Sequence, residues 1–88
     1  MRDRALVRLR AWPPGTTIGR SGGRRYMVCK SVFAGGRSVK LVATELGGSD
    51  YISLNLYDLT GGARLVPCEM PVARVITFLA DLERESAG

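Results

Sequence analysis

Hydrophobic and polar residues alternate along most of the chain, and paired glycines separate the alternating stretches. The pairs are Gly22-Gly23, Gly35-Gly36, Gly47-Gly48 and Gly61-Gly62, at nearly regular intervals. Glycine adopts the positive φ angles of tight turns without a steric cost. Regular turn signals between short alternating stretches indicate strands that follow one another in an antiparallel meander.

The alternation predicts five strands, at about residues 4–12, 25–34, 37–46, 51–59 and 63–66. In the fourth, Ile52, Leu54 and Leu56 are expected to face the core, because side chains alternate between the two faces of a strand. Gly35-Gly36 predicts a two-residue hairpin turn of a primed type. Pro13-Pro14-Gly15 ends the first strand, and residues 16–23 are predicted to form a loop.

The period becomes helical near the C-terminus. A helical spacing relates Val72, Val75, Ile76, Leu79 and Leu82, and Pro71 suits a first helical position. A helix is therefore expected over about 71–85, with Ser86–Gly88 frayed. The whole chain, 1–88, is predicted to be one mainly β domain (β+α). Its five strands form either a small SH3-like or OB-like barrel closed by the C-terminal helix, or an open antiparallel meander with the helix across one face.

Length and composition favour a small globular domain. The chain has 88 residues, of which 45% are hydrophobic, and a dimer would compensate for the limited core of so short a chain. Charged and apolar residues are interleaved at the N-terminus, which lacks the apolar run of about 7–15 residues of a signal peptide. A cytoplasmic protein with no membrane partner is expected.

The residue types limit the available chemistry. There is no histidine, and the two cysteines, Cys29 and Cys68, do not form a CxxC pair. The usual zinc sites and the commonest general base are thereby excluded. We therefore expect no metal, no cofactor and no enzymatic activity. The cysteines are interpreted as free thiols, with a disulfide between them left open.

Charge is unevenly distributed. Residues 1–40 hold ten Lys/Arg and one acid, whereas residues 41–88 hold three Arg and seven acids. This asymmetry suits an anionic partner or a contact between oppositely charged halves. Codon usage in a GC-rich genome would also enrich arginine, and one sequence does not separate the two explanations.

The most pointed candidate site is the predicted outer side of the fourth strand, with Tyr51, Ser53, Asn55 and Tyr57. Exposed tyrosines can stack on bases, each contributing roughly 1–3 kcal/mol. Asparagine can contact a base edge and serine a phosphate. The same tyrosines could instead provide cross-strand packing or the wall of a dimer interface.

Two groups of arginines complete the predicted site. Arg20, Arg24 and Arg25 lie in a glycine-containing segment that could hold a phosphate or could be a solvated connector. Arg2, Arg4, Arg8 and Arg10 would share one side of an extended segment, and this row, with Arg8 and Arg10 as its site residues, could follow a phosphate backbone or could protect an edge strand from aggregation.

These observations together predict a small non-enzymatic binding domain. Charge favours DNA or RNA as the partner. The alternative is a protein-interaction module, a homodimer or other homo-oligomer, with no nucleic-acid role.

Overall fold

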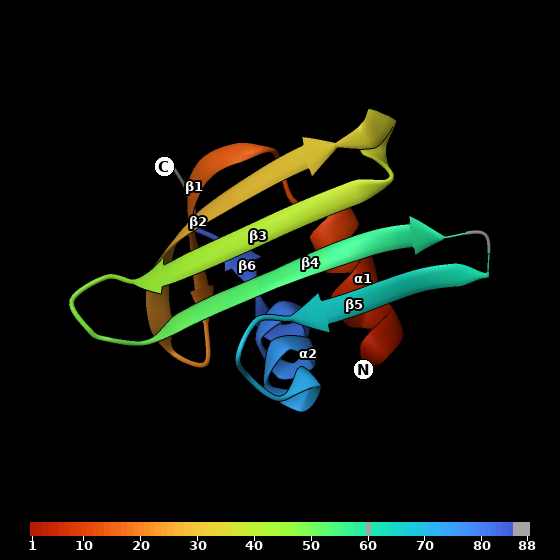
Figure 1. The fold of residues 1–88 in the computed structure, drawn as a ribbon. Helices are drawn as coiled ribbons and strands as arrows, with labels where there is room; N and C mark the ends of the chain where they lie inside the picture. Colours follow the sequence, from red (N-terminus) through yellow and green to blue (C-terminus); the bar gives the residue numbers. More distant parts are fainter. Residues whose placement is uncertain (60, 86–88) are drawn as a thin grey trace.

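The computed structural model describes residues 1–59 and 61–85, which form one antiparallel sheet and two helices (Figure 1). The elements, in chain order, are α1 (Arg2–Ala11), β1 (Gly15–Ser21), β2 (Arg24–Phe33), a 3₁₀ turn (Ala34–Gly36), β3 (Ser38–Glu45), β4 (Tyr51–Leu59), β5 (Gly62–Pro67), α2 (Val72–Asp81) and β6 (Glu83–Arg84). The six strands lie in the order β5-β4-β3-β2-β1-β6, and each pairs antiparallel with its neighbours. The fold is a mixed α/β open meander.

The open-sheet prediction is confirmed and the closed barrel is wrong. Within residues 1–59 and 61–85, β5 and β6 are the two edges of the sheet and do not pair with each other. Both helices lie on the same side of the sheet (Figure 1), and their apolar faces cover the side chains that a barrel would have to enclose. Ile52, Leu54 and Leu56 lie in this single core, as expected, with at most 1% of their surface exposed.

The predicted strands between residues 24 and 67 are confirmed with small shifts at their ends. Phe33 pairs with Ser38, so the β2–β3 loop contains Ala34–Arg37 and is longer than the predicted two-residue turn. A Gly-Gly turn of the two-residue kind occurs instead between β1 and β2. There Ser21 pairs with Arg24, and both glycines have positive φ angles of 60° and 77°.

Residues 2–11 form a helix, so the predicted strand over 4–12 is wrong. Ala5, Leu9 and Trp12 are the buried residues of this segment, and they recur at helical spacing. The two-residue alternation of charge did not reflect the face that is buried. Since α1 buries only Ala5 and Leu9 of its own residues and has no side-chain cap at its N-terminus, long-range contacts must hold it in place.

A buried lysine makes three of these contacts. The Lys30 ammonium, in β2, donates to the carbonyl oxygens of Leu9, Arg10 and Trp12 at 2.7, 3.0 and 2.6 Å. It thereby satisfies carbonyls that a helix C-terminus leaves without partners. Arg4 connects α1 to the other helix, because its Nε donates to the Ala80 carbonyl of α2 at 2.9 Å.

Residues 15–21 form β1, although a loop was predicted there. The segment pairs with β2 along its whole length, from Gly15–Lys30 to Ser21–Arg24. Gly19 is required for close packing, because an added Cβ would lie 3.0 Å from both Leu82 Cδ1 and Trp12 Cη2. The small residues of β1 therefore suit a strand that packs closely against Trp12.

The C-terminal helix is confirmed over a shorter range than the predicted 71–85. It ends at Asp81, where Leu82 becomes extended and is fully buried. The following residues pair with β1 as β6, because Gly19 and Arg20 of β1 offer free backbone groups at the sheet edge. The predicted fraying at Ser86–Gly88 lies outside the described residues. Among those described, neither helix is long and apolar enough to cross a membrane.

Candidate functional site

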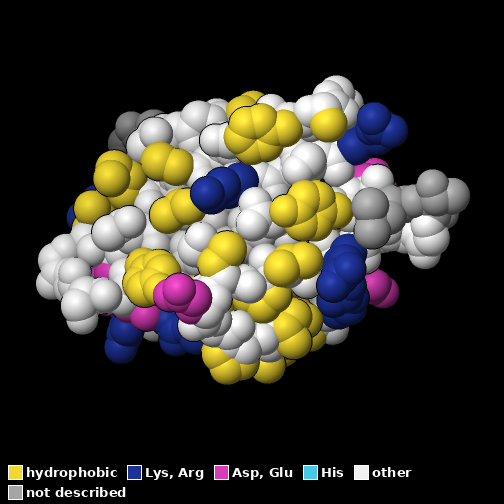
Figure 2. All heavy atoms as spheres, in the orientation of Figure 1, with side chains coloured by type: hydrophobic (Ala, Val, Ile, Leu, Met, Phe, Trp, Pro, Cys, Tyr) yellow, Lys and Arg dark blue, Asp and Glu magenta, His cyan; other side chains and the backbone are white. Residues whose placement is uncertain are grey.

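The side of the sheet opposite the helices is exposed, and we call it the open face. Alternate residues of each strand point to it, because the intervening residues are buried beneath α1 and α2. In β4 the buried residues are Ile52, Leu54 and Leu56, so Tyr51, Ser53, Asn55 and Tyr57 point to the open face. Figure 2 views the molecule from this side and shows hydrophobic and basic side chains interspersed over it, with an acidic side chain towards the left.

One end of the open face holds a row of four side chains from four adjacent strands, Phe33, Ser38, Tyr57 and Arg64. We call it the aromatic row. The Phe33 and Tyr57 side chains leave 53% and 38% of their surface exposed, with the smaller Ser38 between them. Exposed apolar side chains point to a binding surface when they are large and lie close together, more than when they are scattered singly.

The middle of the open face is polar. Lys40 and Asn55 are direct cross-strand neighbours, flanked by Ser31 on β2 and Val66 on β5. The Asn55 amide nitrogen lies 3.7 Å from the Cys68 sulfur. That contact is weak, so the amide keeps most of its hydrogen-bonding capacity.

The other end of the open face presents Met27, Thr44 and Tyr51 on three adjacent strands. Met27 and Tyr51 are 41% and 46% exposed. Tyr51 and Tyr57 stand on the same strand about 20 Å apart, at a rise of about 3.3 Å per residue. Such a separation matches several nucleotides of an extended single strand.

Charge on the open face changes from one edge to the other. On β3, β4 and β5 its charged side chains, among the residues described, are Lys40 and Arg64. Towards β6, Arg25 binds Glu85 through two hydrogen bonds of 2.6 and 2.7 Å. The hydrogen bond with Glu85 raises the pKa of Arg25, and the same bond lowers the pKa of Glu85. The positive charge near β6 is therefore partly neutralised, whereas Lys40 and Arg64 form no salt bridge with any acidic side chain among the residues described.

The structure brings six of the nine predicted site residues to the open face, namely Arg20, Arg25, Tyr51, Ser53, Asn55 and Tyr57. The predicted row containing Arg8 and Arg10 does not exist, because both residues lie on α1, on the other side of the sheet. Arg10 instead lies 3.6 Å from Asp58. Arg24 also points to the helix side, since its neighbour Arg25 faces the open side.

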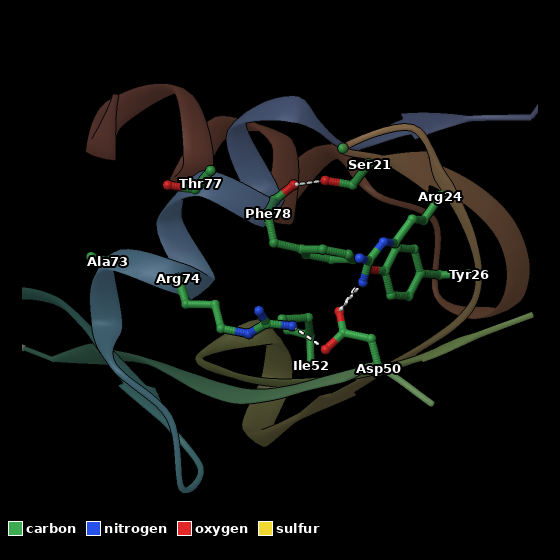
Figure 3. Close-up of a pocket in the computed structure, with 10 residues that line it drawn as sticks. Ser21, Arg24, Tyr26, Asp50, Ile52, Ala73, Arg74, Thr77 and Phe78 are labelled. Atoms are coloured by element: carbon green, nitrogen blue, oxygen red, sulfur yellow. Dashed lines mark hydrogen bonds and ion pairs between the residues drawn. The ribbon is translucent and has the colours of Figure 1, made fainter. Parts of the chain in front are cut away.

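Arg24 lines a cleft of about 480 Å³ between α2 and the ends of β2 and β4 (Figure 3). Asp50 also lines the cleft and accepts hydrogen bonds from Tyr26, at 2.7 Å, and from Arg74. The hydrogen bond from Tyr26, followed by Arg74, lowers the pKa of the Asp50 carboxyl, whereas burial and Asp50 raise the pKa of Tyr26. The Tyr26 ring packs edge-on against Phe78.

The charges in this cleft largely compensate one another. Arg24 lies 3.7 Å from Glu45 and 3.9 Å from Asp50, and Arg74 is bound to Asp50. The network connects α2 to the sheet, and its positive groups already have negative partners. We therefore take the open face, rather than the cleft, as the candidate functional site.

Sequence reasoning missed Phe33, Lys40 and Arg64 as members of the site. Each could have been assigned to the same side of a strand as the tyrosines only with the pairing register known, because a one-residue shift reverses the side. Both cysteines are free thiols. In residues 1–59 and 61–85, no group of three or more Cys, Asp or Glu side chains is arranged to hold a metal ion.

Comparison of the chain with protein-family models, with curated proteins and with solved structures yields no match. Arguments about function therefore depend on the geometry of the open face.

Proposed function

We propose that the domain binds single-stranded DNA or RNA on the open face of its sheet. The observation that supports this most directly is the exposure of Tyr51 and Tyr57, 46% and 38%, on one strand beside Lys40 and Arg64. Aromatic platforms with nearby cations are the usual means by which proteins hold a single strand. A duplex fits this face less well, because its bases are stacked inside and cannot reach the tyrosines.

The expected roles follow from the chemistry of each group. Tyr51 and Tyr57 stack on bases, contributing roughly 1–3 kcal/mol each. Lys40 and Arg64 attract phosphates, and this attraction weakens with salt because bound counterions are released. Ser53 and Asn55 lie between the tyrosines and can donate hydrogen bonds to phosphates or base edges.

Fluorescence anisotropy with labelled oligo(dT) and oligo(U) tests the proposal. We expect binding at low salt, with log K falling against log [salt] by about 0.7 per phosphate neutralised. Tyr57→Ala should weaken binding by about 5- to 150-fold, the equivalent of losing one stacked base. No detectable binding to either oligonucleotide at low salt would contradict the proposal.

Two charge-removing variants form a matched pair. Lys40→Gln and Arg8→Gln each remove one positive charge, but Lys40 lies on the open face and Arg8 lies on α1. Lys40→Gln should reduce both affinity and the salt slope, whereas Arg8→Gln should change them little. Equal losses in the two variants would indicate attraction to the net charge of the domain and no binding on the open face.

The exposure of Met27 and Phe33 on the same face favours a second candidate, self-association of two copies through their open faces. Light scattering separates the two candidates. A dimer that Met27→Ser converts to a monomer, in a protein that binds no oligonucleotide, would favour the second.

A further inference from the structure

The aromatic row has a spacing that suits a flat ring. Phe33 and Tyr57 each pair with Ser38, one from either side, so their backbones are two strand spacings apart. Adjacent strands lie about 4.8 Å apart, which gives about 9.6 Å between the two residues. Stacked aromatic rings have centroids from about 4.5 Å apart, so two successive stacks need about 9 Å.

Provided that the open face binds a single strand as proposed above, we propose that one nucleobase inserts between the Phe33 and Tyr57 rings, over Ser38. We call this position the base slot. Ser38 has a small side chain, and the Phe33 and Tyr57 side chains on either side of it are 53% and 38% exposed. A base in the base slot would stack on Phe33 as well as on Tyr57. At the opposite end of the face, the position that corresponds to Phe33 is held by the flexible Met27, so a base there would stack on Tyr51 alone.

Positive charge surrounds the base slot. Arg64 is the direct cross-strand neighbour of Tyr57, and Lys40 lies two residues along β3 from Ser38 on the same face. Arg37 lies in the adjoining β2–β3 loop and is exposed. The carboxylate at this end, Asp58, is close to Arg10, at 3.6 Å. The phosphates on either side of an inserted base would therefore meet basic side chains that, among the described residues, form no salt bridge.

Stacking is the main interaction that this arrangement offers to the base. Every nucleobase has a π face, so insertion between two rings discriminates weakly among bases. We therefore expect the affinity for an oligonucleotide to fall when the base at the inserted position is missing, and to change little when that base is replaced by another.

Filling the base slot is the most direct test. Ser38→Leu keeps both aromatic rings but occupies the space between them, and Ser31→Leu places the same side chain on the same face outside the aromatic row. We expect Ser38→Leu to weaken oligo(dT) binding by about tenfold or more, within the range for loss of a stacked base. Ser31→Leu should weaken it by less than about threefold, because it leaves that stacking intact.

A second measurement reports on the inserted base itself. Oligonucleotides carrying 2-aminopurine should lose fluorescence on binding the wild type, and Phe33→Ala should reduce the quenching as well as the affinity. Thermal unfolding followed by circular dichroism checks that each variant is folded.

If Ser38→Leu and Ser31→Leu bind alike while Tyr57→Ala is impaired, the base slot is wrong and single-strand binding stands. If the wild type binds no oligonucleotide, the proposed function fails as well.

Discussion

Replacing Lys30 with methionine should release the C-terminal end of α1 from the sheet. Methionine preserves most of the length and the apolar stem of lysine but removes the ammonium group. The three N–H donors of that group match the carbonyls of Leu9, Arg10 and Trp12. Burial, followed by the charge of Arg10, lowers the pKa of the ammonium, and the three carbonyl contacts offset this cost of desolvation.

The expected loss of stability follows from the contacts. Hydrogen bonds to a charged group contribute about 1.5–3 kcal/mol each, and leaving a buried carbonyl without a partner costs about 1–3 kcal/mol. Relief of the desolvation of the ammonium, worth several kcal/mol, opposes these terms. We therefore expect Lys30→Met to lower the free energy of unfolding by about 2–4 kcal/mol. For a domain of 88 residues, whose total is roughly 4–13 kcal/mol, this is a large fraction.

Urea unfolding followed by Trp12 fluorescence measures the loss, since Trp12 supplies one of the three carbonyls. Hydrogen exchange should show early loss of protection in residues 2–11, with β2 to β4 retained under conditions in which the variant is still folded. Lys40→Met, on the open face, is the matched control and should be nearly neutral. A Lys30→Met protein with wild-type stability and a protected α1 would refute the reasoning.

Two further predictions concern the interior and the cleft. Asp50→Asn should flatten the dependence of stability on pH between about pH 5 and pH 3, measured by urea unfolding at each pH. The lowered pKa of Asp50 means that its carboxylate stabilises the folded protein above the usual carboxyl range and loses that effect as pH falls; parallel profiles for variant and wild type would contradict this. Gly19→Ala should lower the free energy of unfolding by about 1–3 kcal/mol through crowding against Trp12 and Leu82, whereas Gly61→Ala, with open space around it, should change it by less than about 0.5 kcal/mol. Equal stability losses in the two glycine variants would show that crowding is not the cause.

The parts of the fold that the sequence predicts are those whose patterns are set locally. β4 is predicted because Ile52, Leu54 and Leu56 alternate with polar residues and all lie in the core. α1 is not, because its charges alternate every second residue while its buried residues, Ala5 and Leu9, are four residues apart, and because its C-terminal carbonyls are bound by Lys30, a residue far along the chain. Likewise β1 is composed largely of glycine, threonine and serine, and becomes a strand through its pairing with β2.

The candidate site likewise contains residues that the sequence predicts locally and residues that depend on distant parts of the chain. Tyr51 and Tyr57 could be assigned to one exposed face from the alternation of β4 alone. The partnership of Tyr57 with Phe33 and Arg64 depends on the register of four strands, which is fixed by turns of different lengths. The predicted arginine row failed for another reason, since it required an extended segment where the chain is helical.

The two-layer arrangement separates the residues that stabilise the protein from those available for binding. Side chains under the helices fill the single interior, while the outward positions of β3 to β5 contribute little to it. Substitutions there can accumulate without opening a cavity. The domain is therefore suited to serve as a scaffold, in which randomised outward positions would yield new ligand specificities from clones that remain folded.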